Sequence, residues 1–277
     1  MLYLERIPAP PLARFVRSLW HCENLRLTHN FERVLPSGAA QLIVNLKEDR
    51  TRTYLPEKNF ACETTSGTVL SGAQMRYCVI DTAETECVVG AVFCPGGTAP
   101  FFHLPAHEIS DRSISLDLLW GRRASDLREQ LLAAPSPHAR LETLERLLTL
   151  AFQPLSPDAA VDFALQVFHH RPDRNSVAAV TDRTGLSARR FIQRFKSSVG
   201  LSPKQYCRIL RFQSALTCAR TADVDWTRIA LDCGYFDQAH FIHDFRDFSG
   251  ITPTGYRRGR TEFQNHVKFL QSPAAAL

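Results

Sequence analysis

The chain has 277 residues, of which 44% are hydrophobic and 22% charged, a composition that excludes a largely disordered protein and a length that allows two globular domains. The first residues lack the apolar run of a signal peptide and no stretch approaches a membrane span, so we expect a cytoplasmic protein without membrane contact. The net charge of +5 is uneven, because residues 158–260 carry 16 Lys and Arg against 10 Asp and Glu while residues 1–157 carry 16 against 17, and a basic second half suits a polyanion.

The first half combines helical and strand signals. The apolar spacing over 11–20 is helical. Short apolar runs separated by turn residues predict strands over 41–46, 68–70, 75–80 and 87–93. Helical periodicity returns over 116–120, 127–132 and 141–152. We therefore expect a sensor or regulatory domain over 1–153, a mixed β-sheet or barrel-like structure with flanking helices, followed by a proline-containing linker over 154–158.

Beyond the linker every expected element is a helix, and the same signals occur twice. In each unit a glycine ends a short helix, a polar residue caps the next helix, and a polar residue with proline opens a third. These are Gly185, Ser187 and Ser202-Pro203 in the first unit, and Gly234, Asp237 and Thr252-Pro253 in the second. The helix that opens at Pro203 is expected to run to about Arg220.

These helix start and stop signals are part of an internal repeat. Phe191, Phe195 and Tyr206 recur as Phe241, Phe245 and Tyr256 at a constant offset of 50. Before the glycines the offset is 49, so the units differ by one residue inside the short turn that follows the glycine. A duplicated helix-turn-helix explains this arrangement and allows one chain to read two neighbouring stretches of DNA groove. We expect units at about 176–198 and 225–248 within an all-α DNA-binding domain over 159–261, followed by a tail over 262–277.

The second unit carries a long and specific motif. Ile229-Ala230-x-x-Cys233-Gly234-Tyr235, followed by Phe236-Asp237-Gln238-Ala239-His240-Phe241 and by Gly250-Ile251-Thr252-Pro253, resembles the signature of the AraC/XylS family of transcriptional regulators. The first unit resembles the other half of that family's DNA-binding domain. The resemblance implies an α+β protein in which a variable first domain precedes a tandem helix-turn-helix domain.

The resemblance also implies which residues meet DNA. Base-facing positions would be Arg189, Ile192 and Gln193 in the first unit, and Gln238, Ala239, His240, Ile242 and His243 in the second. Candidates for phosphate contacts are Arg190, Arg194, Lys196, Lys204 and Arg246. A solvated outer helix face is the plain alternative for one such helix, but two matched units favour DNA. Ala239 and His243 have less capacity for specific contacts with base edges than Arg189 and Gln193. We therefore expect the first half-site to carry more of the sequence discrimination.

No catalytic residue, cofactor or metal is predicted; His240 and His243 lie three residues apart but lack further ligands. The expected partner is double-stranded DNA. A small-molecule effector and a homodimer are left open, as is RNA polymerase if the protein is an activator. The sequence does not choose between activation and repression.

Residues 34–46 and 90–108 resemble an uncharacterised domain that is found ahead of such DNA-binding domains and has no known ligand. Cys94 supports two alternative hypotheses: a thiol that accepts a methyl group from alkylated DNA, or a thiol whose oxidation is the signal. Without C-x-x-C pairs, free buried thiols are the expected state of the cysteines. The adjacent Pro95-Gly96-Gly97 is either an anion-binding nest or an ordinary turn.

Overall fold

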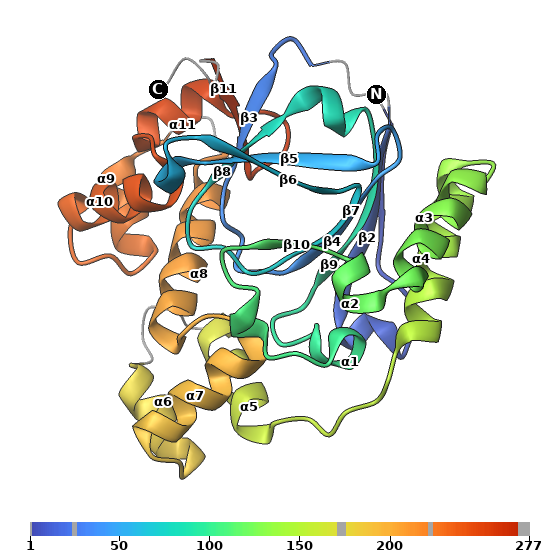
Figure 1. The fold of residues 1–277 in the computed structure, drawn as a ribbon. Coiled ribbons are helices and arrows are strands. Elements are labelled where there is room, and N and C mark those ends of the chain that lie inside the picture. The colour runs from blue at the N-terminus through green and yellow to red at the C-terminus, as the bar shows by residue number, and fades with distance from the viewer. Residues whose placement is uncertain (1, 24–26, 171–175, 221–223, 271–277) are drawn as a thin grey trace.

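Two antiparallel sheets with flanking helices make up the first part of the chain, and a group of helices follows them (Figure 1). The computed structural model describes residues 2–23, 27–170, 176–220 and 224–270. The α+β class, with a β-domain ahead of an all-α tandem helix-turn-helix domain, is confirmed. Within these residues the strand pairs are all antiparallel, so the sheet is not mixed in direction. No helix in the same residues combines the length and apolar composition needed to cross a bilayer.

A six-stranded sheet carries the core of the β-domain. Its strands, in spatial order, are β1 (Leu2–Arg6), β2 (Val16–Glu23), β9 (Cys87–Phe93), β4 (Gln41–Asn45), β7 (Thr68–Ser71) and β10 (Ser113–Ser115). Apolar side chains on one face, including Leu42 and Val89, are buried against α3 (Arg122–Ala133) and α4 (Pro137–Ala151). The short helices α1 (Ala99–Phe102) and α2 (Asp117–Trp120) complete this cover.

The second sheet contains a strand from the far end of the chain. Its order is β11 (His266–Phe269), β3 (Phe31–Val34), β8 (Cys78–Asp81), β5 (Arg50–Leu55) and β6 (Ala61–Ser66). β11 follows the helical domain in sequence, yet His266 pairs with Val34 and Phe269 with Phe31. The predicted tail therefore returns to the β-domain; its end, residues 271–277, lies outside the described residues.

The expected helix over 11–20 is wrong. Only Leu12–Arg14 forms a single 3-10 turn, and Val16–Glu23 is strand β2. The pairing of β2 with β9 shifts register between Val16 and Ser18, which marks a β-bulge. The extra residue turns Val16 and Leu19 to the same buried face, so a bulged strand shows the three-residue spacing of a helix.

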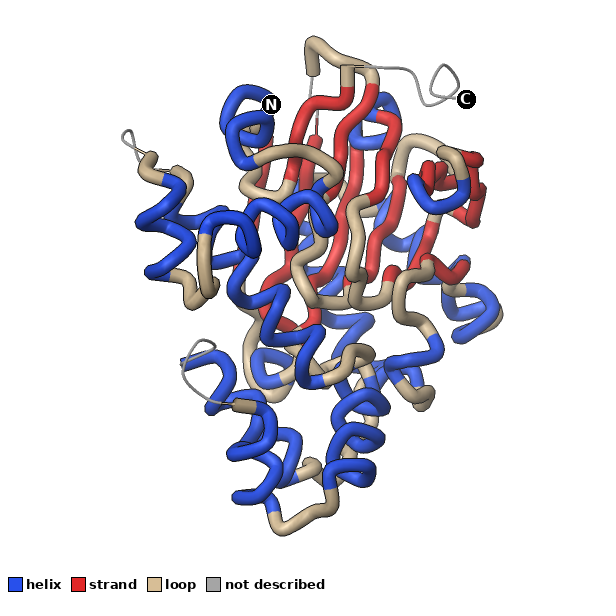
Figure 2. Tube along the Cα trace, turned by 90° about the vertical axis from the view of Figure 1, so that its left-hand side faces the viewer, coloured by secondary structure: helices blue, strands red, loops and turns tan. Residues whose placement is uncertain are grey.

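Among the described residues from 159 to 260 there are seven helices, as the sequence predicts. They are α5 (Ala159–His170), α6 (Val177–Thr184), α7 (Ala188–Val199), α8 (Pro203–Cys218), α9 (Trp226–Asp232), α10 (Gln238–Ser249) and α11 (Pro253–Gly259). The linking helix α8 ends at Cys218, slightly before the expected Arg220, and at ~1.5 Å per residue it spans roughly 24 Å. Figure 1 shows α6 and α7 at one end of α8 and α9 and α10 at the other. Figure 2 shows the strands side by side in the upper part of the molecule, with helices beside and below them.

Candidate nucleic-acid interface

The two helix-turn-helix units are built from the same contacts. The ring centroids of Phe195 and Tyr206 lie 5.7 Å apart, and those of their repeat counterparts Phe245 and Tyr256 lie 5.8 Å apart. Ser187 caps α7 by accepting the N–H of Arg190 and, fifty residues on, Asp237 caps α10 by accepting that of His240. The scaffold that places each second helix is therefore duplicated in space as well as in sequence.

The two second helices carry opposite charge. α7 contains four basic residues, Arg189, Arg190, Arg194 and Lys196, and no acidic one. α10 contains Arg246 together with Asp244 and Asp247. Because DNA is a polyanion, the first unit offers much the stronger electrostatic attraction.

Two of the predicted base-facing residues are only partly exposed. Arg189, Ile192 and Gln193 are exposed on α7, as are Gln238, Ala239 and His243 on α10. Ile242 is half-buried against the core, and His240 is half-buried with its ring 5.3 Å from that of Tyr235. Nδ1 of His240 also accepts the N–H of Phe236 at 3.5 Å. These two side chains therefore serve the packing of the second unit.

Among the predicted phosphate contacts, Arg194 differs from the rest. Arg190, Lys196, Lys204 and Arg246 are exposed. Nε of Arg194 instead donates to Oδ2 of Asp158 at 2.6 Å, and Asp158 also accepts the N–H groups at the start of α5. The charge of Arg194 is thus already balanced by a carboxylate at the start of α5, the helix that precedes the first unit.

The second unit contains the same ion pair with its charges exchanged. Nη2 of Arg208, on α8, donates to Oδ1 of Asp244, on α10, at 2.7 Å. Asp158 and Arg208 are related by the repeat offset of 50, and so are Arg194 and Asp244. In both units the pair attaches the second helix to the helix that precedes the unit. The sequence analysis missed these pairs, although comparing charges at the repeat offset would have found them.

One cluster has the donor types of a metal site. The side chains of His243, Asp244 and Asp247 bring their ligand atoms within 4.8 Å of one another. Arg208 donates to both carboxylates, at 2.7 Å to Asp244 and 3.2 Å to Asp247. A side-chain cation therefore already compensates the negative charge of this cluster.

Both units contact the β-domain at the carboxyl ends of their second helices. Oγ of Ser110 donates to the carbonyl of Gly200, at the end of α7, at 2.5 Å. The N–H of Tyr77 donates to the carbonyl of Phe248, at the end of α10, at 3.0 Å. The amino-terminal ends of α7 and α10, which carry the exposed polar residues, are left to the solvent.

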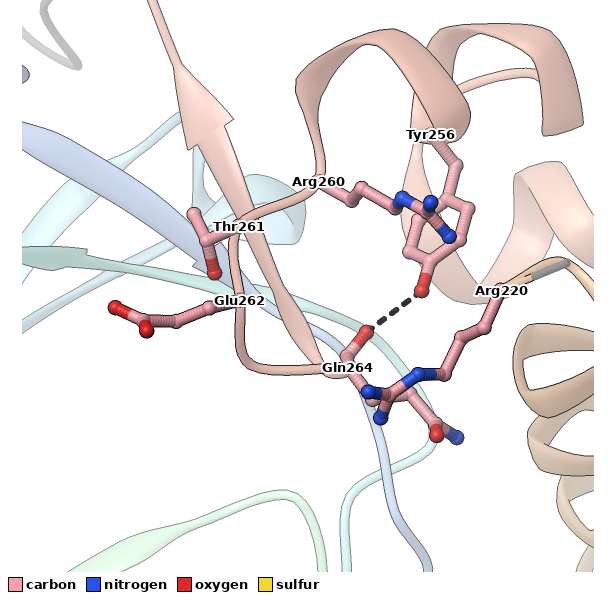
Figure 3. Close-up of a pocket in the computed structure, with 6 residues that line it drawn as sticks. All are labelled: Arg220, Tyr256, Arg260, Thr261, Glu262 and Gln264. Carbon is pink, nitrogen blue, oxygen red and sulfur yellow. Dashed lines mark hydrogen bonds between the residues drawn. The ribbon is translucent and has the colours of Figure 1, made fainter. Parts of the chain in front are cut away.

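The linking helix and the tail complete the contact between the two halves. Nε2 of Gln213 on α8 donates to the carbonyl of Pro36 at 2.7 Å. A polar cavity of about 210 Å³ lies where α8, α11 and the segment before β11 meet (Figure 3). There the hydroxyl of Tyr256 donates to the carbonyl of Gln264 at 2.9 Å, and Arg260 donates to that of Ala219 at 2.8 Å. The first bond attaches the tail to α11, and the second attaches the end of α11 to the end of α8.

Cys94 and the turn beside it have structural roles. Burial raises the pKa of the Cys94 thiol, so the environment disfavours the reactive thiolate. Gly96 has a φ of +80° and lies against Ser198 of α7. Gly97 approaches the carbonyl of Phe15 so closely that a Cβ would not fit. The glycines therefore form a close-packed turn between the β-domain and the first unit.

Comparison with known proteins finds a matching domain family in each half of the chain. Residues 180–259 match a helix-turn-helix domain family, and residues 4–115 match a domain of unknown function, DUF6597. The HTH-type transcriptional activator RhaS of Escherichia fergusonii is 36% identical over 91 residues, which are 33% of this chain and 33% of that protein. RhaS of Escherichia coli K12 is 34% identical over 94 residues, 34% of each chain. The chain thus spans about a third of the length of these relatives.

Two solved structures illustrate the structural neighbours. The DNA-binding domain of AdpA, a global transcriptional factor crystallised with a target DNA, is 25% identical, with a TM-score of 0.34, over 37% of this chain and 92% of that one. Unsaturated fatty acid-bound ToxT from Vibrio cholerae is 10% identical, with a TM-score of 0.47, over 92% of this chain and 94% of that one.

Proposed function

Since the second half of this chain is an AraC/XylS-type DNA-binding domain behind an uncharacterised first domain, we propose that the whole chain is a sequence-specific regulator of transcription. The observation that carries the proposal is the duplicated scaffold, in which matched caps and ring pairs place α7 and α10 alike. Double-stranded DNA is its partner, and each second helix meets a major groove.

The proposal gives the two units different roles. Arg189 reads guanine, Gln193 reads adenine, and Ile192 contacts a thymine methyl group, all from exposed positions on α7. Arg190, Lys196, Lys204 and Arg246 hold phosphates. Gln238, Ala239 and His243 contact the second half-site, while His240 and Ile242 support the helix that carries them.

The first half, residues 1–153 with a linker over 154–158, is the regulatory part of this proposal. Its contacts with the ends of both α7 and α10 support this role, because any shift of the β-domain would move both helices. A small-molecule effector or a second copy of the chain would act through these contacts. The RhaS relatives are named activators, and an activator would also contact RNA polymerase.

The test is a comparison of two arginine variants of the full chain. A duplex is selected by the parent from a random library, and binding to it and to a scrambled duplex is followed by fluorescence anisotropy at several salt concentrations. Arg189→Ala should lose about 1–3 kcal/mol on the selected duplex and little on the scrambled one. Arg190→Ala should weaken binding to both duplexes alike and lower the salt slope by about one.

Two outcomes would contradict the proposal. A parent chain that selects no sequence is not a sequence-specific regulator. If Arg189→Ala binds both duplexes as tightly as the parent, base reading by Arg189 is wrong. Methyl transfer to Cys94 or its oxidation as a signal has no support, since burial raises the pKa of this thiol.

A further inference from the structure

The second unit contains one residue that has no counterpart in the first. The turn of the first unit is Gly185-Leu186-Ser187, and that of the second is Gly234-Tyr235-Phe236-Asp237. Leu186 and Tyr235 both pack against the core of the helical domain. Ser187 and Asp237 are both helix caps. By elimination, Phe236 is the inserted residue.

Phe236 is held in place but is not packed. Its side chain is 87% exposed. Its N–H donates to Nδ1 of His240, and the next residue, Asp237, accepts the N–H of the same histidine at 2.7 Å. The first bond attaches the backbone of Phe236 to α10, and the second caps the same end of the helix at the next residue. In a helix-turn-helix this end of the second helix is the one that reaches base edges.

The remainder of α10 offers little for reading bases. Asp244 is engaged by Arg208, His240 and Ile242 are half-buried, and its carboxylates repel phosphates. Next to Phe236 and its capping aspartate, Gln238 is the exposed amide and Ala239 a small apolar side chain. Phe236 is therefore the largest exposed apolar side chain at this end of the helix.

We propose that Phe236 is a specificity-determining residue that contacts the 5-methyl group of a thymine in the second half-site. A phenyl ring has no hydrogen-bond donor or acceptor for base edges, and thymine is the base that presents an apolar group in the major groove. Burial of the exposed ring against that methyl removes apolar surface of both partners from water. The inference rests on the proposed function and adds an apolar contact to it.

The experiment combines Phe236→Ala with duplexes in which each thymine of the second half-site is replaced by uracil, which lacks the methyl group. At one position the parent should lose about fourfold in affinity, the factor expected for burial of one methyl group. Phe236→Ala should lose roughly four- to tenfold on the thymine duplex and show no further loss on the uracil duplex. Phe236→Leu, which keeps an apolar side chain, should retain part of the discrimination.

Leu118→Ala is the matched control, because Leu118 is 75% exposed and lies on α2 in the β-domain. It should bind both duplexes as the parent does. Equal losses of Phe236→Ala on thymine and uracil duplexes would overturn the methyl contact. Unchanged DNA binding with a loss of transcriptional activation would overturn it in favour of a protein partner at Phe236. If the parent bound no duplex at all, the proposed function would fail first and this inference with it.

Discussion

The carboxylate of Glu32, on β3, connects this strand with β11 near the carboxyl end of the chain. It is buried, and it accepts hydrogen bonds from Nε2 of His29 at 2.7 Å and from Nδ1 of His266 at 2.6 Å. Burial by itself would raise the pKa of Glu32, but the hydrogen bonds from His266 and His29 outweigh it and the pKa is lowered. His266 belongs to β11, so this carboxylate helps to hold the returning tail in the β-domain.

Glu32→Gln should therefore destabilise the fold in a pH-dependent way. A carboxylate with a lowered folded pKa adds stability above its unfolded pKa of about 4.3, and this stability is lost as the pH falls through the folded value. At pH 7 we expect the variant to lose about 1–3 kcal/mol, as for weakened hydrogen bonds to a buried charge. Urea unfolding at pH 7 and at a series of pH values below 4 checks this, because the difference between the two proteins should shrink as the pH falls through the lowered folded pKa of Glu32. A constant difference would show that Glu32 contributes through shape alone.

Among the elements, α7 and α10 are the pair in which duplication and divergence are both visible. Each is attached to the preceding helix by one ion pair at equivalent positions, and the charges are exchanged between the units. The exchange places a positive charge on α7 and a negative one on α10. The two helices therefore keep one geometry while differing in attraction for DNA.

Arg208→Ala should destabilise the second unit, because it removes the bidentate partner of Asp244, whose side chain is only 5% exposed. We expect a loss of about 1–3 kcal/mol in the free energy of unfolding. The reversed pair, Arg208→Asp with Asp244→Arg, should regain part of the loss, since the first unit already uses that polarity. Both are measured by thermal unfolding.

The control for this pair is Arg228→Ala, which breaks an ion pair between side chains that are both well exposed, Arg228 and Asp232. It should change stability by no more than about 0.5 kcal/mol. An Arg208→Ala variant as stable as Arg228→Ala would mean that Asp244 does not need its partner.

At the scale of the molecule, the β-domain packs against both units at the glycines that end their second helices, Gly200 and Gly250. Gly250 has a φ of +69°, and a Cβ there would collide with the ring of Tyr77. Gly200 has a φ of +93° and lies against Ser110. Because the β-domain contacts the carboxyl ends of both α7 and α10, it helps to hold the two helices in position relative to each other.

Gly250→Ala should weaken the contact between the β-domain and the second unit. Gly185 is the matched control, because it also has a φ of +69° but has no neighbour within 4 Å of a Cβ. Gly185→Ala should cost only the left-handed backbone penalty of about 1–2 kcal/mol, whereas Gly250→Ala should cost more and speed hydrogen exchange around Tyr77. Adding Tyr77→Ala should remove the steric part. Equal costs for the two alanine variants would argue against a close fit at Gly250.

Much of the helical half follows from the sequence. Caps, left-handed glycines and apolar periodicity act within a few residues, so Ser187, Asp237 and the buried phenylalanines identify the helices and their faces. In α7 the buried residues Phe191, Phe195 and Val199 follow helical spacing, whereas Ala188 at the start of the helix is exposed.

The candidate site was only partly predictable for a related reason. The spacing of residues along a helix shows which of them share a face, but it does not show which residue of another helix contacts that face. For example, the sequence does not show that Arg194 is paired with Asp158. The exposed Phe236 was visible only as a one-residue change of offset.

By itself the sequence determined the α+β class, the duplicated units and the asymmetry between their exposed residues, because these depend on local backbone preference and on side-chain chemistry. The tertiary structure decided that 16–23 is a bulged strand, that β11 returns to β3, and that both units are held by the β-domain. Strand pairing and domain contact join residues far apart in the chain, and no local spacing specifies such partners.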